Sequence, residues 1–268
     1  MAKRRYSVDE QTIAKRMQEG RGKGTGKNYI PWIKVHEVPS KGRSSIRMGW
    51  KTGREHHLLS ALEASYFFTL EWNQPCTDIR EQYPLLPLAE TIEIAEHIKV
   101  KHPRDPKTKA FIVMSTDFLG TFNVNAASPL KARSVKYEVD RQVSRTQEKL
   151  LIEREYWRRR NVDWKVITEN SIDAVLVKNI KWIHGSHTLD GYYDDLDKST
   201  YERLIIEIPD LITGSATTPI STITDYLDET YGLRSGVSMH VFKHLICHRK
   251  LHVDMHQPIL TSRPVILR

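Results

Sequence analysis

The sequence predicts a mixed α/β protein whose last third is mostly helical. Apolar residues first recur at helical spacing, short apolar runs typical of strands follow in the middle of the chain, and helical patterns dominate from residue 171 onward. A helix, two strands, a helix and a further strand in this order are typical of a sheet with helices packed on it. The 268 residues allow one large domain or two of ordinary size.

The positive charge of the chain is concentrated in its N-terminal fifth. Residues 1–54 contain 14 Lys and Arg against 4 Asp and Glu, whereas residues 171–268 contain 10 against 12. We expect the first segment to be a basic arm that contacts DNA, because cations placed on phosphates release counterions. The acidic last third is better suited to a protein partner. The predicted DNA contacts are Lys3, Arg4, Arg5, Arg21, Lys23, Lys27, Lys51 and Arg54.

The arm is predicted to begin with a short helix over residues 7–20. Ser7 and Glu10 have the spacing of a capping box at its start. A glycine-rich loop follows at 20–27. A longer helix is predicted over residues 55–72, because leucine and aromatic side chains recur there on one face.

The middle of the chain alternates between extended and helical patterns. The elements predicted there are an extended segment at 76–88, a helix at 89–99, strands at 110–119 and 131–139, a charged helix at 141–160 and a strand at 164–168. Together with the helix before them, these elements define a core domain over residues 55–168.

Residues 171–268 are predicted to form a separate, winged-helix-like domain. Several short helices and a terminal extended pair are the basis for this prediction. The helices are expected near 171–184, 197–208, 218–230 and 235–248, and the extended pair near 250–262.

Asp117, Ser134 and Lys136 are the most informative candidate site residues. Asp117 lies in the apolar run at 110–119, and the other two alternate along the next predicted strand, so they share one face while Val135 points into the other layer. A carboxylate on one strand and a lysine on its neighbour are typical of metal-dependent nucleases. The carboxylate holds a divalent cation, and the lysine orients the attacking water.

A second carboxylate, Glu63, lies at the edge of the apolar stripe of the preceding helix. A surface salt bridge is the alternative interpretation of this residue. Two carboxylates and a lysine suffice to place Mg²⁺ against a phosphate, because Mg²⁺ takes oxygen ligands and keeps several waters. We therefore predict Glu63, Asp117 and Lys136 as catalytic residues, Glu63, Asp117 and Ser134 as metal ligands, and Gln82 and Val135 as supporting residues.

The chain resembles the TnsA family, the endonuclease subunits of heteromeric cut-and-paste transposases. The resemblance is strong over residues 1–168 and looser beyond. The matching segments are Gly-Arg-Gly-Lys-Gly-Thr-Gly-Lys-Asn-Tyr-Ile-Pro-Trp at 20–32, Lys-Thr-Gly-Arg-Glu-His-His-Leu-Leu-Ser at 51–60, Asp-Ile-Arg-Glu-Gln-Tyr-Pro-Leu-Leu-Pro at 78–87, Lys-His-Pro at 101–103, Met-Ser-Thr-Asp-Phe-Leu at 114–119 and Glu-Lys-Leu-Leu-Ile-Glu-Arg-Glu-Tyr-Trp at 148–157.

The resemblance implies a restriction-endonuclease-like core with a Glu, an Asp and a Gln-x-Lys as its active-site signature. Glu63, Asp117 and Lys136 match this signature, whereas Ser134 stands where the family has Gln. A hydroxyl is a weaker metal ligand than an amide oxygen, so Ser134 would bind through a water, or Glu138 on the same face would compensate. The expected cofactor is Mg²⁺, with Mn²⁺ as a substitute.

The resemblance also implies partners and a reaction. Family members cut the 5′ ends of a transposon, the TnsB transposase cuts and joins the 3′ ends, and the ATP-dependent regulator TnsC binds the C-terminal domain. Two alternatives remain open from the residues. One is a non-catalytic subunit that bridges DNA ends, and the other is a stand-alone restriction-type endonuclease.

The sequence predicts a cytoplasmic protein with no membrane partner. The basic N-terminus lacks the apolar stretch of a signal peptide, and no apolar run approaches the length of a membrane span.

Overall fold

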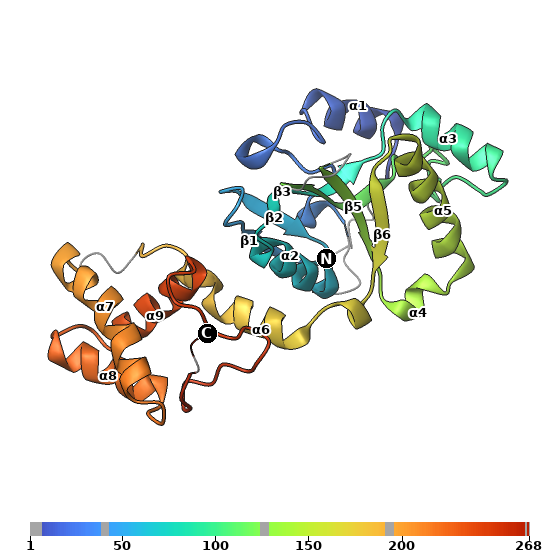
Figure 1. Cartoon of the computed structure of the whole chain (residues 1–268). Coiled ribbons are helices and arrows are strands. Elements are labelled where there is room, and N and C mark those ends of the chain that lie inside the picture. Colours follow the sequence, from blue (N-terminus) through green and yellow to red (C-terminus); the bar gives the residue numbers. More distant parts are fainter. Residues whose placement is uncertain (1–6, 39–42, 124–128, 191–195, 266, 268) are drawn as a thin grey trace, which may run out of the picture. The chain divides into compact units, whose positions relative to one another are not determined.

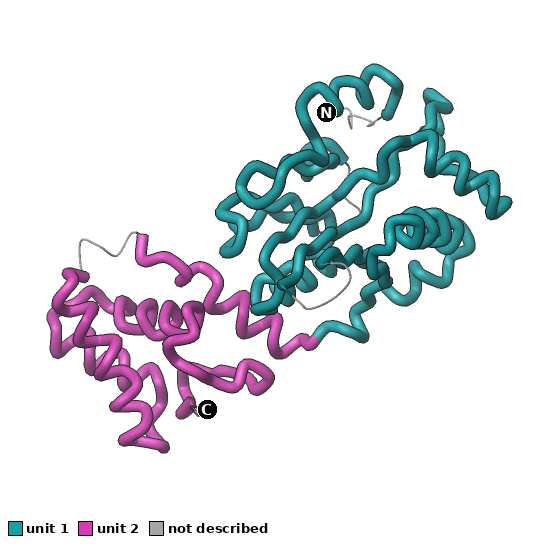
Figure 2. Tube along the Cα trace, turned by 45° about the horizontal axis from the view of Figure 1, so that its top comes forward, with its two compact units in different colours: residues 1–172 teal, residues 173–268 magenta. Residues whose placement is uncertain are grey.

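The computed structural model describes residues 7–38, 43–123, 129–190, 196–265 and 267 (Figure 1). The chain divides into two compact units, residues 1–172 and residues 173–268 (Figure 2). The first contains a sheet with helices, and the described part of the second is helical. The predicted mixed α/β class is therefore confirmed.

A four-stranded sheet forms the centre of the first unit. Its strands are β3 (Cys76–Pro84), β4 (Ser115–Phe122), β5 (Leu130–Val135) and β6 (Asp163–Ile167), in that order across the sheet. The β3–β4 and β4–β5 pairs are antiparallel, whereas β5 and β6 are parallel. The parallel pair is possible because helix α5 (Ser144–Arg159) provides the long crossover that such a connection requires.

Helices pack on both faces of this sheet (Figure 1). On one face, Leu119 of β4 joins the apolar core made with α5 and α3 (Leu88–His97). On the other face, Phe118 packs edge-on against Tyr66 of α2 (Ala61–Trp72), with ring centroids 5.6 Å apart. Successive strand residues thus face opposite layers, as strand geometry requires.

The segment before the sheet is folded onto it rather than extended as a free arm. Val8, Tyr29 and Trp32 are buried, and the Trp32 N–H donates to the Gln82 carbonyl of β3 at 3.2 Å. Its elements are α1 (Glu10–Gln18), the 3₁₀ turns η1 (Gly26–Asn28) and η2 (Val35–Glu37), and the hairpin strands β1 (Ser45–Met48) and β2 (Glu55–Leu58).

Two predicted helix starts were wrong. The first helix begins at Asp9, whose carboxylate accepts the Thr12 N–H at 2.7 Å, so Ser7 is not its cap. The second begins at Ser60, because residues 55–58 pair with β1 as a strand. The Ser60 hydroxyl accepts the Glu63 N–H and so caps the helix, which ends the extended segment at this residue.

Further boundaries differ from the prediction. The strand predicted at 110–119 begins at Ser115 and ends at Phe122, and the helix predicted at 197–208 continues to Gly214. Strand β5 ends at Val135 instead of continuing to residue 139, and the charged helix is split into α4 (Glu138–Arg141) and α5. Glu138 therefore lies on a helix, where it accepts a hydrogen bond from Arg141 at 3.3 Å. The idea that it shares a strand face with Ser134 was wrong.

The described part of the second unit consists of helices and their connections. A connecting turn, η3 (Glu169–Ser171), precedes this unit. The elements of the second unit are α6 (Ala174–Ile183), η4 (His184–Ser186), α7 (Lys198–Gly214), α8 (Ile220–Thr230) and α9 (Val237–Cys247). In place of the extended pair predicted at 250–262, Val253 forms a single antiparallel bridge with Leu267. Within the described residues, no helix is long and apolar enough to cross a membrane.

Candidate active site

Asp117 and Lys136 meet at the end of the β4–β5 pair. The register pairs Phe118 with Arg133, which places Asp117 opposite Ser134. The Val135 N–H donates to Oδ2 of Asp117 at 2.6 Å, and Nζ of Lys136 binds the same oxygen at 2.5 Å. The structure therefore brings together the two residues that the strand pattern had linked, and it adds the Val135 amide as a positioning contact.

Glu63 enters the site from the first turn of α2. Its carboxylate accepts hydrogen bonds from the Leu59 N–H at 2.9 Å and from Oγ of Ser60 at 3.1 Å, so it also caps its own helix. The side chain is buried, which excludes the alternative of a surface salt bridge. Burial, and then the charge of Asp117, raise the pKa of Glu63 to about 7.

Gln82 connects Glu63 with the sheet. Its Nε2 donates to Oε2 of Glu63 at 3.2 Å, and its Oε1 accepts from Oγ of Ser115 at 3.1 Å. The backbone of Gln82 has a φ of 48°, in the left-handed region that a residue with a Cβ rarely occupies. Strained residues of this kind persist where the surrounding structure requires them, and they cluster at functional sites.

Ser134 points at a carboxylate that sequence reasoning missed. Its Oγ donates to Oε2 of Glu153 on α5 at 2.6 Å, and both side chains are buried. Oε1 of Glu153 accepts from Thr116 at 2.8 Å and from the Trp164 indole at 2.9 Å. The hydroxyl of Ser134 is thus used to hold Glu153, which does not support its predicted role as a metal ligand.

The sequence contains a pattern that indicates burial of Glu153. It follows Leu150 by three residues and precedes Trp157 by four, so a helix over this segment places it on the same face as these apolar side chains. An acidic residue on the apolar face of a charged helix is rarely buried without a partner. Burial, and then the charge of Asp117, raise its pKa.

The site gathers three carboxylates around one lysine. Partial burial alone would lower the pKa of Lys136, but the carboxylates of Asp117, Glu153 and Glu63 raise it above its ordinary value. Burial is the larger cause of the raised pKa values of Glu63 and Glu153, and the like charge of Asp117 adds to it. A cation bound among them would relieve this repulsion.

The oxygen donors at this site match a hard divalent cation. Within the described residues, no group of three His, Cys, Asp or Glu side chains is arranged to hold a metal. Mg²⁺ needs only one or two carboxylates because it keeps several waters. Asp117 has an oxygen, Oδ1, without a hydrogen bond among the described residues, and Glu63 adds the second carboxylate. The residues therefore fit Mg²⁺.

A cleft of about 400 Å³ is lined by two members of this group and not by Asp117 or Glu63. Lys136 and Glu153 line it together with Lys149 of α5 and Ser115 of β4. The Lys136 side chain is 33% exposed, so solvent reaches this member of the group.

The predicted DNA contacts of the arm fall into three groups. Lys3, Arg4 and Arg5 lie outside the described residues. Lys23 and Lys27 are exposed, and Lys51 is half-buried with its Nζ on the Asn73 carbonyl at 2.9 Å. Arg21 and Arg54 are buried, and this argues against the predicted phosphate contacts at both positions.

Arg21 and Arg54 stabilise the fold through buried ion pairs. Arg21 binds Glu37 at 2.7 Å. Arg54 binds Glu81 of β3 at 2.6 and 2.9 Å, and Nδ1 of His56 lies 2.7 Å from the same carboxylate. Although burial opposes it, His56 and Arg54 lower the pKa of Glu81 to about 2. The contacts of Arg54 and His56 with Glu81 join the β1–β2 hairpin to the sheet.

Known proteins share both units of this chain. The model of the TnsA-like endonuclease N terminal family matches residues 73–169, which include Asp117, Lys136 and Glu153, and that of the TnsA endonuclease C terminal family matches residues 171–255. The chain is 45% identical over 193 residues to the transposon Tn7 transposition protein TnsA of Escherichia coli, and the aligned part spans 70% of this chain and 67% of that protein. With both family models matched and this identity, the chain belongs to the TnsA family and is a DNA endonuclease of a transposable element.

Proposed function

We propose that this endonuclease uses Mg²⁺ to cleave the 5′ ends of a transposon during cut-and-paste transposition. The observation that carries the proposal is the Asp117 carboxylate, held by the Val135 amide and Lys136 beside the buried Glu63. Mn²⁺ is expected to substitute for Mg²⁺, because the same oxygen ligands suit both ions.

Each residue of the site has a distinct role in this proposal. Asp117 and Glu63 hold the ion, which supplies charge neutralisation at the phosphate and lowers the pKa of a bound water. Lys136 contacts the phosphate or the attacking water. Gln82 orients Glu63 through its amide, and Glu153 receives the Ser134 hydroxyl and the Trp164 indole as a buried support beneath the strand.

We further propose a restriction-endonuclease-like fold for the core. A four-stranded mixed sheet with α2 and α5 on opposite faces supports this fold, as does the location of the site on two neighbouring strands. For residues 173–268 we retain the winged-helix-like fold as a proposal, based on the helices of that unit. The partners proposed from the family resemblance are transposon-end DNA, TnsB and TnsC.

The test is 5′-end cleavage of a plasmid that carries the two transposon ends. The full-length chain is incubated with TnsB, TnsC, ATP and Mg²⁺, and wild type is compared with Asp117→Ala. We expect the variant to lose 5′ cleavage by at least about 100-fold, because it loses a cation ligand and the anchor of Lys136. Glu138→Ala is a suitable control, since Glu138 is a nearby carboxylate paired with Arg141.

Assembly of the complex is measured in parallel by size-exclusion chromatography. If Asp117→Ala fails to assemble, Asp117 has a structural role. If neither protein cuts although both assemble, the chain is a DNA-bridging subunit and the proposal is wrong. Cutting of ordinary DNA without TnsB and TnsC would instead identify a stand-alone nuclease.

A further inference from the structure

A second cavity of about 500 Å³ is lined by residues adjacent in sequence to residues of the active-site cleft. Adjacent residues of three segments line the two spaces in turn. His102, Phe111 and Arg145 line the second cavity, whereas their neighbours Pro103, Ile112 and Thr146 line the active-site cleft. The two spaces therefore share three chain segments, one of which is the start of α5.

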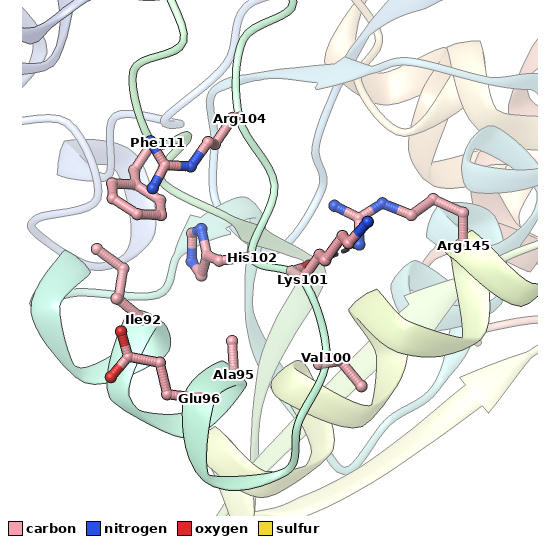
Figure 3. A pocket seen from close by; sticks show the side chains of 9 residues that line it. All are labelled: Ile92, Ala95, Glu96, Val100, Lys101, His102, Arg104, Phe111 and Arg145. Atoms are coloured by element: carbon pink, nitrogen blue, oxygen red, sulfur yellow. Dashed lines mark hydrogen bonds between the residues drawn. The ribbon is translucent and has the colours of Figure 1, made fainter.

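Four cationic side chains line this path, which we call the basic groove. Lys136 of the active site stands at one end of it. Figure 3 shows Lys101 and Arg145 next to each other on one side of the second cavity, with Arg104 over the Phe111 ring. The residues of the basic groove are Lys101, Arg104, Arg145 and Lys149.

Most of these cations have no carboxylate partner. Among the described residues, no ion pair involves Lys101, Arg104 or Lys149, whereas Arg145 pairs with Glu148. The Arg104 guanidinium lies 3.6 Å from the centroid of Phe111 and donates to the Lys109 carbonyl at 3.2 Å. These contacts fix the side chain but leave its charge uncompensated. Two acidic residues also line the walls, Glu96 in the second cavity and Asp140 in the cleft.

The position of the charges opposes the usual electrostatics of a helix. The N-terminus of a helix favours anions, yet the first turn of α5 has no acidic residue, and Arg145 and Lys149 lie in its first two turns. Burial, and then the charges of Arg145 and Lys136, lower the pKa of Lys149. A cation in the first turn, such as Arg145, is unfavourable against the helix dipole, and a bound anion would offset this cost.

We propose that the basic groove binds the backbone phosphates of the DNA that flanks the scissile bond, with Lys149 and Arg104 as its principal contacts. The inference rests on the proposed function, because the groove includes the cleft that Lys136 of the active site lines. A polyanion is the partner that uses several unpaired cations in a row. Arg104 presents a planar guanidinium, which matches a phosphate. The groove replaces part of the surface predicted on the N-terminal arm.

The experiment measures how DNA binding by the full-length chain depends on salt. Fluorescence anisotropy of a labelled 30-base-pair duplex of arbitrary sequence is recorded in EDTA at a series of KCl concentrations. Each lost phosphate contact reduces the slope of log K against log salt by about 1. We expect Lys149→Gln and Arg104→Gln each to lower the slope by about 1 and the affinity by about 3- to 10-fold at low salt, and the double variant to lower the slope by about 2.

The matched control is Arg158→Gln, on the last turn of the same helix, where Arg158 pairs with Glu155. It removes one positive charge from α5 outside the groove and should leave the slope unchanged. Thermal unfolding checks that each variant folds. Because EDTA prevents cleavage, the result does not depend on whether the active site cuts.

Several outcomes would overturn the proposal. One is an unchanged slope in both groove variants. Another is an equal decrease of the slope in Arg158→Gln, which would mean that only the net charge of the protein determines DNA binding. A lower slope only in Lys23→Gln and Lys27→Gln would place the phosphate contacts on the N-terminal arm instead. A wild-type chain that does not bind the duplex even at low salt would exclude the groove as a DNA site.

Discussion

At the scale of single residues, Ser134 separates two descriptions of the site. As a metal ligand it would contact the ion, but its hydroxyl donates to the buried carboxylate of Glu153 at 2.6 Å. A buried acceptor that loses its donor costs about 1–3 kcal/mol. The contact therefore predicts that Ser134 contributes to stability and to the position of α5 rather than to cation affinity.

Ser134→Ala should lower the free energy of unfolding by about 1–3 kcal/mol. It should leave the Mg²⁺ concentration for half-maximal cleavage within about threefold of wild type, because Asp117 and Glu63 are unchanged. Chemical denaturation measures the first effect, and 5′ cleavage across a Mg²⁺ titration measures the second. A tenfold or larger shift in the Mg²⁺ requirement would restore Ser134 as a ligand.

Replacing Gln82 by Gly is expected to relieve backbone strain and at the same time to reduce cleavage. Gly at this position relieves a φ of 48°, worth about 1 kcal/mol, but it removes the amide between Glu63 and Ser115. We expect Gln82→Gly to change the free energy of unfolding by less than about 1 kcal/mol while 5′ cleavage falls about 10- to 100-fold.

Asn161→Gly is the control for this prediction, because Asn161 also has a positive φ, of 53°, but lies beyond α5 in an exposed turn. It should keep full cleavage. Full cleavage by Gln82→Gly as well would show that the strained backbone serves the fold alone.

At the scale of elements, Glu71 controls how the turn between β1 and β2 is held. Glu71 lies at the end of α2, and its carboxylate accepts the Trp50 N–H. Its other oxygen, Oε1, is buried and has no hydrogen-bond partner among the described residues. Burial raises the pKa of Glu71 to about 7, from 4.5 in the unfolded chain, although the amides of Trp50 and Lys51 oppose the shift. As pH rises, the folded protein therefore keeps the Glu71 proton up to a higher pH than the unfolded chain does.

This shift predicts that stability falls as pH rises. Below pH 4.5 both states are protonated, between 4.5 and about 7 only the folded state is, and above about 7 neither is. The Glu71 contribution is thus present at low pH and lost by pH 8, an effect of up to about 3 kcal/mol. Glu71→Gln should remove this part of the decline in urea unfolding between pH 5 and 8. An identical decline in the variant would contradict the assignment.

The sequence predicted the strands of the site better than its helices. Asp117 and Lys136 were recognisable because a short apolar run and a neighbouring alternation specify a strand pair. The start of α2 was missed because residues 55–58 continue the polar and apolar pattern of the helix, and only their pairing with β1 makes them a strand. Glu153 was missed because its partners, Ser134, Thr116 and Trp164, come together only in the folded sheet.

At the scale of the whole molecule, the candidate chemistry and the proposed partner binding lie in different units. Glu63, Asp117, Lys136 and Glu153 all belong to residues 1–172, which have their own buried core. Residues 173–268 form a second core around buried side chains such as Leu204, Leu227 and Phe242. A unit with its own core is expected to fold alone.

A fragment of residues 1–172 should therefore unfold cooperatively, and Mg²⁺ at about ten times its Kd should stabilise it by about 1.4 kcal/mol. Asp117→Ala in the same fragment should abolish that gain. The fragment should not co-purify with TnsC, whereas the full-length chain and a fragment of residues 173–268 should, because the regulator is proposed to bind the second unit. Retention of TnsC by residues 1–172 would move the partner surface onto the endonuclease unit. Unfolding without a cooperative transition would show that the nuclease core depends on the residues after Ile172.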